Sequence, residues 1–532
     1  MTWADRDSGV SLAELLGAFS LATDLGLGQP MEHMLRSWRI AARIADHMGL
    51  PEEPRRSLFY VAMLGWVGCV ADAPEVAASF GDDIAFRADS YQVDLAGPAA
   101  AGFFMARAGR GGTAAHRMRI AASMLADGGK KVVQGMKSHC LTTAAMAQQL
   151  ALGPDVAGAV QQFFARWDGR GVPPGVGGMD IVPVMRVVHL ADVVEVHHRV
   201  AGSDGATQVA RARRGSHFAP DVVDAFLAIA PDVLAEAEEA DASDLHALLG
   251  AEPQLRRSLS QGELDAALTV LADFTDLRSA SRAGHSRAVA RLAEEAARGL
   301  GLPEADAAAV RRGGLLHDIG LHGVPVTILD KPGPLSATEW ERMRLSSYYT
   351  ERVLARPSAL ARLGAVAALA HERMDGTGYH RGLGGASLTM TGRILAAACV
   401  FRALVEPRAH RAALPGRQAC TALQAEVRAG RIDGEAAEAV LAAATGRRRR
   451  VSGPAGLTPR EVEVLVLISR GAKSGDVARR LGISRKTADT YVERIYTKTG
   501  ASSRSTATLF ALRTGLLDPL EPLDLSGELP TT

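Results

Sequence analysis

Cysteine, lysine and aromatic residues are scarce in this chain of 532 residues. The four cysteines, Cys69, Cys140, Cys399 and Cys420, have no paired or zinc-ribbon spacing, so a disulfide framework is not indicated and a reducing compartment is favoured. The first residues do not resemble a signal peptide, and no apolar run reaches the length of a membrane span. We therefore expect a cytoplasmic protein without a membrane partner.

The charge of the chain is balanced, with 60 basic and 59 acidic residues and a net charge of +1. This balance excludes a global attraction to nucleic acid. Basic charge is local instead: Arg447–Arg450 form an arginine run that is either a solvated linker or an arm that contacts phosphates. Hydrophobic residues make up 47% of the chain, enough for packed cores, and the length predicts three or four domains. Apolar residues recur at helical spacing, which predicts an all-α fold.

The sequence contains an internal repeat. His33 precedes the pair Gly65-Trp66 by the interval that separates His285 from the pair His317-Asp318, a displacement of 252 residues. Further along, the displacement is 207 residues, and these positions coincide: Asp168–Gly171 with Asp375–Gly378, Arg186 with Arg393, His139 with Ser346, and Asp192 with Cys399. The difference is a 45-residue insertion in the first copy, between Trp66 and His139. Its glycine-, alanine- and arginine-rich part, 97–112, is expected to be loop between helices.

The adjacent His317 and Asp318 indicate a chemical role for the second copy. A hydrolytic metal centre needs imidazoles and carboxylates that converge from several helices, with one coordination position open for water. In Gly313–Gly320 an apolar stretch buries one helical face, and the residues that follow can direct two ligands toward a shared pocket. Taken alone, a His-Asp pair is equally consistent with a hydrogen bond at a helix end.

Several segments of the second copy resemble HD-domain phosphohydrolases of the HD-GYP type. They are Gly284–Arg287, Leu316–Gly320, Leu329–Leu335 with Glu339-Trp340, and His371–Tyr379, within residues 280–405. The resemblance implies an all-helical domain that binds two or three iron or similar ions and hydrolyses cyclic di-GMP through a metal-bound hydroxide. The metal ligands that it implies are His285, His317, Asp318 and His371, and Asp318 is the catalytic candidate if the domain is active.

The second copy also departs from that family pattern. Ser346 and Ala370 stand where the family has histidines, Cys399 where it has aspartate, and Leu321 where it usually has lysine. Cys399 could coordinate as a thiolate, although a small buried cysteine in an apolar run is the favoured interpretation. Loss of a group that supports a ligand already lowers metal affinity or activity by about 10- to 100-fold, and loss of a ligand itself lowers them further. We therefore expect one weakly held divalent metal (Fe, Mn or Mg) or none, and no catalytic activity.

The first copy has lost different residues. It keeps His33, His139 and Asp192, but Gly65-Trp66 replaces the central pair and Phe163-Phe164 stands at the place of the later histidines. Glycine and aromatic residues at former ligand positions predict that side chains fill this pocket. The first copy is therefore expected to be a packing module.

The C-terminal segment has the local signals of a helix-turn-helix. Thr458–Glu461 is a capping box with proline at the first helical position, so a helix begins there. A short second helix ends at Gly482, and Ser484 caps a third helix. In that third helix Ala488, Val492 and Ile495 point inward, while Lys486, Arg494 and Lys498 point outward. Two helices joined by a glycine-containing turn, with a basic face on the second, predict DNA binding.

The run from Leu457 to Leu516 closely resembles the LuxR-type DNA-binding domain. The resemblance implies that the helix from Ser484 to about Thr499 enters the major groove and that the helix from about Ser503 to Thr514 pairs two subunits. Double-stranded DNA and a second copy of the chain are thus the expected partners. The residues expected to contact DNA are Lys486, Thr487, Thr490, Arg494 and Lys498. The alternative is a compact helical module that only mediates protein contacts.

The predicted domains are a degenerate HD-like copy at 11–245, an HD-GYP-like copy at 260–445, a LuxR-type domain at 453–517 and a disordered tail at 518–532. The favoured function is a DNA-binding transcriptional regulator whose HD-GYP-like region is a sensor, with a nucleotide as a candidate effector, or a dimerisation module. One alternative is a metal-dependent cyclic-dinucleotide phosphodiesterase with an accessory DNA-binding domain. The other is an interaction scaffold with vestigial HD pockets.

Overall fold

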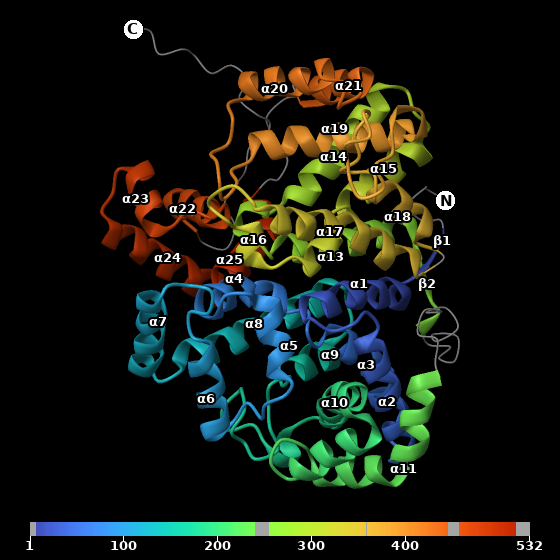
Figure 1. Cartoon of the computed structure of the whole chain (residues 1–532), viewed down its shortest axis with the longest axis vertical. Helices are drawn as coiled ribbons and strands as arrows, with labels where there is room; N and C mark the ends of the chain where they lie inside the picture. Colours follow the sequence, from blue (N-terminus) through green and yellow to red (C-terminus); the bar gives the residue numbers. More distant parts are fainter. Residues whose placement is uncertain (1–6, 240–254, 358, 445–456, 518–532) are drawn as a thin grey trace. The chain divides into compact units, whose positions relative to one another are not determined.

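The computed structural model describes residues 7–239, 255–357, 359–444 and 457–517, and these are mainly helical (Figure 1). Within them the only sheet is a ribbon of two antiparallel strands, β1 (Asp7–Ser11) and β2 (Ser258–Ser260). The prediction of an all-α fold is confirmed. The chain divides into two compact units, Met1–Ser260 and Gln261–Thr532. The arginine run 447–450 and the predicted disordered tail 518–532 lie outside the described residues.

The first unit is built around α2 and α10, which pack against each other and against α3 and α11. Its helices are α1 (Leu12–Gly26), α2 (His33–His47), α3 (Glu52–Leu64), α4 (Cys69–Phe80), α5 (Asp83–Ser90), α6 (Gly97–Arg107), α7 (Ala114–Asp127), α8 (Lys130–Gln149), α9 (Pro154–Val160), α10 (Pro183–Ala212) and α11 (Pro220–Glu239). α10 is two helices joined by a kink, because Ala201 and Gly202 have non-helical backbone angles.

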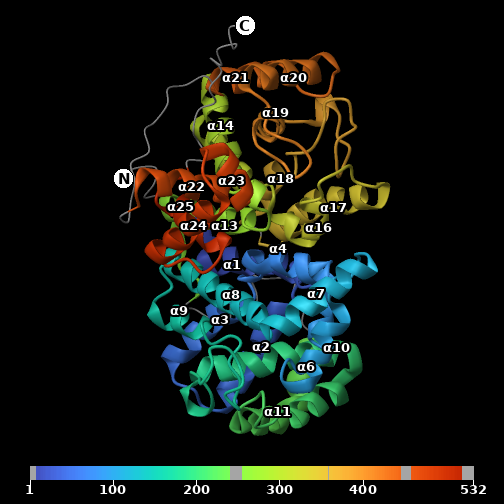
Figure 2. The ribbon, with the colours of Figure 1, turned by 90° about the vertical axis from the view of Figure 1, so that its left-hand side faces the viewer.

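The larger part of the second unit repeats this plan, with α14 packed against α15, α19 and α21. Its helices are α13 (Gln261–Asp276), α14 (His285–Gly299), α15 (Glu304–Leu316), α16 (Val326–Leu329), α17 (Ala337–Ala355), α18 (Ala361–Ala367), α19 (Met390–Val405), α20 (Gly416–Arg428) and α21 (Gly434–Ala444). A short 3-10 helix, η5 (Ile319–Gly323), follows α15. The apolar residues at helical spacing in α14 and α19 form its core, and Figure 2 shows α20 and α21 beside α19.

Four helices make up the last described segment: α22 (Pro459–Ser469), α23 (Ser474–Leu481), α24 (Arg485–Thr499) and α25 (Arg504–Arg513). The predicted capping box is present, since Glu461 N–H donates to Thr458 Oγ1 and Thr458 N–H donates to Glu461 Oε2. Ala488 and Ile495 are buried in the shared core, and Val492 packs against it. The segment therefore has a hydrophobic core of its own.

The two units share a hydrogen bond and a backbone conformation at the start of α2 and of α14. Asp24 accepts a hydrogen bond from Met34 N–H, and Asp276 accepts one from Ser286 N–H, 252 positions further on. The residue before each helix is left-handed: Glu32 has φ 81° and Gly284 has φ 75°. Because a non-glycine residue seldom adopts that conformation, its retention at Glu32 indicates that the surrounding fold imposes it.

The 45-residue insertion of the first copy is helical, and the expectation of a loop at 97–112 is wrong over most of its length. α6 occupies Gly97–Arg107, with Pro98 in its first turn. Three consecutive alanines follow that proline, and alanine is the best helix former. The glycine content of the segment misled the prediction.

One stretch of the first unit, Glu52–Phe80, is long and apolar enough to cross a membrane by length and composition, contrary to the expectation from sequence. In the structure this stretch comprises α3, a turn and α4, and 72% of its most apolar window is buried within the protein. Its apolar residues therefore have a place in the core of the first unit.

Candidate functional site

Four predicted metal ligands converge in the second unit. His285 opens α14, His317 and Asp318 follow α15, and His371 lies after α18. Asp318 is central: its Oδ2 lies 3.3 Å from His317 Nε2 and 3.8 Å from His285 Nε2, and its Oδ1 lies 3.8 Å from His371 Nε2. One ligand atom from each of His285, His317 and Asp318 lies within 4.8 Å of the others.

Supporting hydrogen bonds turn two of these imidazoles toward the centre. His285 Nδ1 lies 2.6 Å from Glu406 Oε2, and His317 Nδ1 lies 2.8 Å from the Gly314 carbonyl oxygen. Metal-bound histidines are commonly oriented in this way, by a carboxylate or a carbonyl at the second ring nitrogen. His317 Nε2 is buried and has no hydrogen-bond partner among the described residues. The donor set therefore fits one divalent cation.

The protonation state of the histidines also suits a metal. Burial lowers the pKa of His285 and that of His371 to about 3, and it lowers the pKa of His317 as well. All three imidazoles are thus neutral at pH 7, the form that coordinates metals. A cation that binds here does not have to displace protons from them.

A side chain that the sequence analysis did not single out opposes metal binding. The Arg282 guanidinium is in ion-pair contact with Asp318 Oδ2, the atom nearest to His317. Burial lowers the pKa of Arg282 to about 10, and the neighbouring Arg408 acts in the same direction. Arg282 remains charged at pH 7, and it supplies the positive charge that Asp318 would otherwise take from a metal.

The three substituted positions are buried and contribute no ligand atom to the group of His285, His317 and Asp318. Ser346 Oγ donates to the Met343 carbonyl of its own helix. Ala370 offers no donor atom. Burial raises the pKa of Cys399 to about 12, which favours the interpretation as a small buried thiol.

The equivalent centre of the first unit is an ion-pair network. His33 Nδ1 lies 2.5 Å from Glu195 Oε2, and its Nε2 lies 3.1 Å from Asp192 Oδ1. Burial alone would lower the pKa of His33, but the carboxylates of Glu195 and Asp192 together raise it to about 10. His33 is therefore an imidazolium, which has no lone pair for a metal.

Aromatic rings fill the rest of the first unit's former ligand positions. Gly65 has no room for a side chain, because a Cβ atom there would clash with the Phe163 ring. Trp66 packs edge-on against Phe163, with ring centroids 4.9 Å apart, and donates from Nε1 to Asp192. His139 is enclosed by these rings and hydrogen-bonds to the Gly65 carbonyl oxygen. Side chains thus occupy the former ligand positions, but Trp66, Phe163 and Phe164 also line a cavity, so the prediction that side chains fill the whole pocket is wrong.

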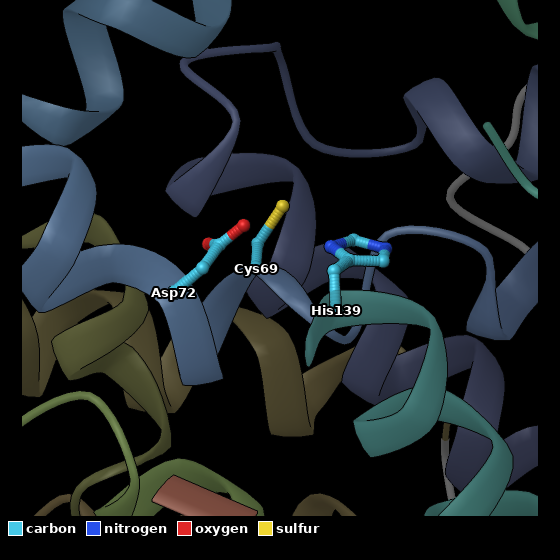
Figure 3. A group of neighbouring side chains, drawn as sticks. All are labelled: Cys69, Asp72 and His139. Atoms are coloured by element: carbon cyan, nitrogen blue, oxygen red, sulfur yellow. The ribbon is translucent and has the colours of Figure 1, made fainter. Parts of the chain in front are cut away.

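A second group of potential ligands in the first unit consists of Cys69, Asp72 and His139 (Figure 3). The Arg87 guanidinium already binds Asp72 and the Cys69 carbonyl oxygen. Burial raises the pKa of Asp72 to about 6 and lowers that of His139 to about 4. A buried guanidinium beside Asp72 repels a metal ion, as Arg282 does in the second unit. This group also offers one imidazole, whereas three imidazoles surround Asp318, so it is the weaker candidate for a metal site.

The glutamates that hold the first histidine of each copy were missed from sequence, although the repeat contains a signal for them. At the displacement of 207 residues, Glu195 and Arg199 coincide with Arg402 and Glu406. The two residues have exchanged places one helical turn apart, and each pair forms an i,i+4 ion pair. In both units it is the glutamate that contacts the leading histidine.

The residues predicted to contact DNA lie on α24, but they do not share one environment. Lys486, Thr487 and Arg494 are exposed. Thr490 Oγ1 donates to the Lys486 carbonyl oxygen within the helix. Lys498 Nζ lies 2.7 Å from Glu461 Oε2 of α22, so this lysine also ties two helices of the domain together.

Comparisons with known proteins identify the two domains in which these residues lie. An HD domain model matches residues 269–436, and a model described as bacterial regulatory proteins of the luxR family matches residues 455–511. The 3'3'-cGAMP-specific phosphodiesterase 3 of Vibrio cholerae is 31% identical over 408 residues, 76% of this chain and 88% of that protein. The cyclic di-GMP phosphodiesterase of Thermotoga maritima is 35% identical over 154 residues, 29% of this chain and 41% of that protein.

A solved structure extends the likeness over both units. The crystal structure of a cyclic GMP-AMP specific phosphodiesterase of V. cholerae superposes with a TM-score of 0.58 at 27% identity, over 81% of this chain and 97% of that one. The chain belongs to the HD-domain family, among relatives of the HD-GYP phosphodiesterases. Within that family it is a member whose HD domain is followed by a luxR-family DNA-binding domain.

Proposed function

We propose that the protein is a transcriptional regulator that binds double-stranded DNA as a homodimer. The observation that carries this proposal is the luxR-family match at 455–511, in which the exposed face of α24 presents Lys486 and Arg494. A recognition helix of this kind enters the major groove and reads base edges with such side chains. α25 is the proposed contact between two DNA-binding domains.

The proposed role of the HD domain is to sense a nucleotide effector. A relative that covers 76% of this chain is named for its action on 3'3'-cGAMP, and others are named for their action on cyclic di-GMP. A cyclic dinucleotide is thus the candidate effector of the second unit. A divalent ion held by His285, His317, Asp318 and His371 would supply a Lewis acid there. Glu406 orients His285, and Arg282 competes with the ion for Asp318.

The second candidate function is a metal-dependent phosphodiesterase on cyclic dinucleotides. It is favoured by the convergence of four potential ligands on one centre and by the 88% coverage of the V. cholerae enzyme. Two observations favour the sensor instead. The substituted positions Ser346, Ala370 and Cys399 supply no further ligand, and Arg282 contacts Asp318. The expected turnover of 3'3'-cGAMP and cyclic di-GMP with iron, manganese or magnesium is therefore at background. Hydrolysis that Asp318→Ala abolishes would establish the enzyme.

DNA binding by the full chain tests the regulator. A duplex selected from a randomised pool serves as the site, and its affinity is measured over a range of salt concentrations. Replacing Lys486 and Arg494 with alanine should cost about 1–3 kcal/mol for the one that contacts a base and should flatten the salt dependence. The control removes the same charge elsewhere, with Arg291→Ala and Arg298→Ala on α14, and should bind normally. Equal binding by both double variants would refute the assignment.

A further inference from the structure

A cavity of about 570 Å³ lies inside the first unit. Its floor is the aromatic cluster of Trp66, Phe163 and Phe164, and its walls come from α6, the turn between α7 and α8, and α10. Figure 1 shows α6 and α7 beside α8 within this unit. The volume falls within the range of roughly 300–1,000 Å³ typical of small-molecule sites. The insertion that has no counterpart in the second copy thus encloses much of the cavity.

The cavity walls are mainly apolar and adaptable. Met105, Met124 and Met136 line them, and methionine side chains adjust to ligands of different shape. α7 has no buried residue, and its Leu125 lines the cavity while remaining 71% exposed. Apolar side chains of α7 are therefore left without a packed partner, and an apolar ligand would bury them.

One buried cation in the cavity wall, Arg213, has no ion-pair partner among the described residues. Arg213 is 9% exposed, and its guanidinium has no hydrogen bond within that part of the chain either. Arg166, also in the wall, is already paired with Asp94 and Asp168. Burial lowers the pKa of Arg213, Asp94 partly offsets this, and the like charge of Arg166 adds to it. A buried charge without a partner is costly, so an anion beside Arg213 is strongly favoured.

The other polar groups of the wall limit the anion to a small one. Burial keeps His189 and His217 neutral by lowering the pKa of each. Asp192 contributes a negative charge, although His33, Trp66 and Tyr91 hold one of its oxygens. Arg170 also lines the cavity, but its side chain is exposed to water, so Arg213 is the buried cation there without an ion pair in the described part of the chain. A phosphate dianion or a cyclic dinucleotide would bring more negative charge into the buried part of the cavity than Arg213 balances. A single carboxylate matches it.

We propose that the first unit binds an apolar monocarboxylate, with its hydrocarbon or aryl body in the cavity and its carboxylate paired with Arg213. This site is separate from the metal and nucleotide site proposed for the second unit, and it does not depend on that site being occupied. It gives the first copy a ligand in place of the metal that His33 and the aromatic cluster exclude.

Calorimetric titration of the full chain with decanoate and 2-naphthoate tests the proposal. At least one of them should bind once per chain, and 1-decanol should bind at least about tenfold more weakly than decanoate, because it lacks the charge that pairs with Arg213. Arg213→Met should weaken carboxylate binding by about tenfold or more. Ala101→Trp, which places a large ring in the cavity, should abolish binding of the same ligands.

The matched control is Arg214→Met. Arg214 is the next residue, lies on the surface and pairs with Asp224. It should bind the carboxylates like the natural chain, and the far-ultraviolet circular dichroism and thermal midpoint of all variants check folding. Absence of saturable binding, or equal binding by the Arg213 and Arg214 variants, overturns the proposal. So does a cyclic dinucleotide whose binding is lost in Arg213→Met and in Ala101→Trp. Carboxylate binding that persists while the second unit binds no nucleotide leaves this site standing and removes only the nucleotide sensor.

Discussion

Among the single residues of the second unit, Arg282 stands directly against metal binding. The neutral histidines and Asp318 form a donor set for a cation, and Arg282 brings a permanent cation to the same carboxylate. Two positive charges at one aspartate repel each other strongly in a buried site. Metal affinity is therefore a competition that this side chain biases against the ion.

Removing Arg282 should strengthen metal binding. We expect Arg282→Ala to raise the affinity of the full chain for Mn²⁺ by about tenfold, because the ion no longer competes with a guanidinium. Isothermal titration with Mn²⁺ measures the change. Arg291→Ala is the control, since Arg291 pairs with Glu295 at the surface. Unchanged or weaker Mn²⁺ binding in Arg282→Ala would show that Asp318 is not a ligand.

His33 should make the first unit less stable at alkaline pH. Its pKa is about 10 in the folded protein, against an ordinary value of 6.5. A raised folded pKa gives stability that is fully present below pH 6.5 and is lost as the pH rises toward 10. Between pH 6.5 and 9.5 the free energy of unfolding of the natural chain should fall by on the order of 2–4 kcal/mol more than that of His33→Gln, as measured by urea unfolding. Parallel pH profiles for the two chains would contradict the imidazolium assignment.

At the scale of elements, local signals predicted well where sequence and packing agree. The capping box at Thr458–Glu461, the cap at Ser484 and the apolar face of α14 could be predicted because each depends on neighbours in the sequence. α6 was missed because glycine and proline count as loop residues unless their position in the first turn is weighed. The role of Arg282 was not predicted, because it contacts Asp318 only in the folded chain and no regular spacing in the sequence links the two residues.

Replacing each of two glycines of the first unit with alanine should have opposite effects on the stability of the chain. Gly102 lies inside α6, and a Cβ atom added there would have no neighbouring atom within 4 Å. Gly102→Ala should therefore stabilise the chain by about 0.5–1 kcal/mol. At Gly65, after α3, the Phe163 ring occupies that space, and Gly65→Ala should destabilise by about 1–3 kcal/mol. Chemical denaturation of both variants measures the difference. Equal effects would mean that Phe163 does not fill the former ligand position.

At the scale of the whole molecule, we propose that the DNA-binding domain acts together with that of a second copy. LuxR-type domains read paired half-sites, so two α24 helices must be held about one DNA turn, roughly 34 Å, apart. We propose that the two HD-like copies, which precede this domain in the sequence, supply most of the subunit contact.

A fragment of residues 453–532 should therefore bind DNA much more weakly than the full chain and should be mainly monomeric. Analytical ultracentrifugation gives the oligomeric state of both, and gel-shift titration on the selected duplex gives both affinities. Equal affinities and equal oligomeric states would mean that α25 alone is sufficient for pairing and that the helical units serve another purpose.

The charged centre of the first unit has a consequence for the physiology of the protein. His33, Glu195 and Asp192 satisfy one another through a bound proton, whereas His285, His317 and Asp318 leave a place that an ion can fill. A change in the supply of iron or manganese would change the occupancy of only the second of these centres. The first centre would stay unchanged, so any response of the protein to metal supply would arise from one of its two HD-like copies.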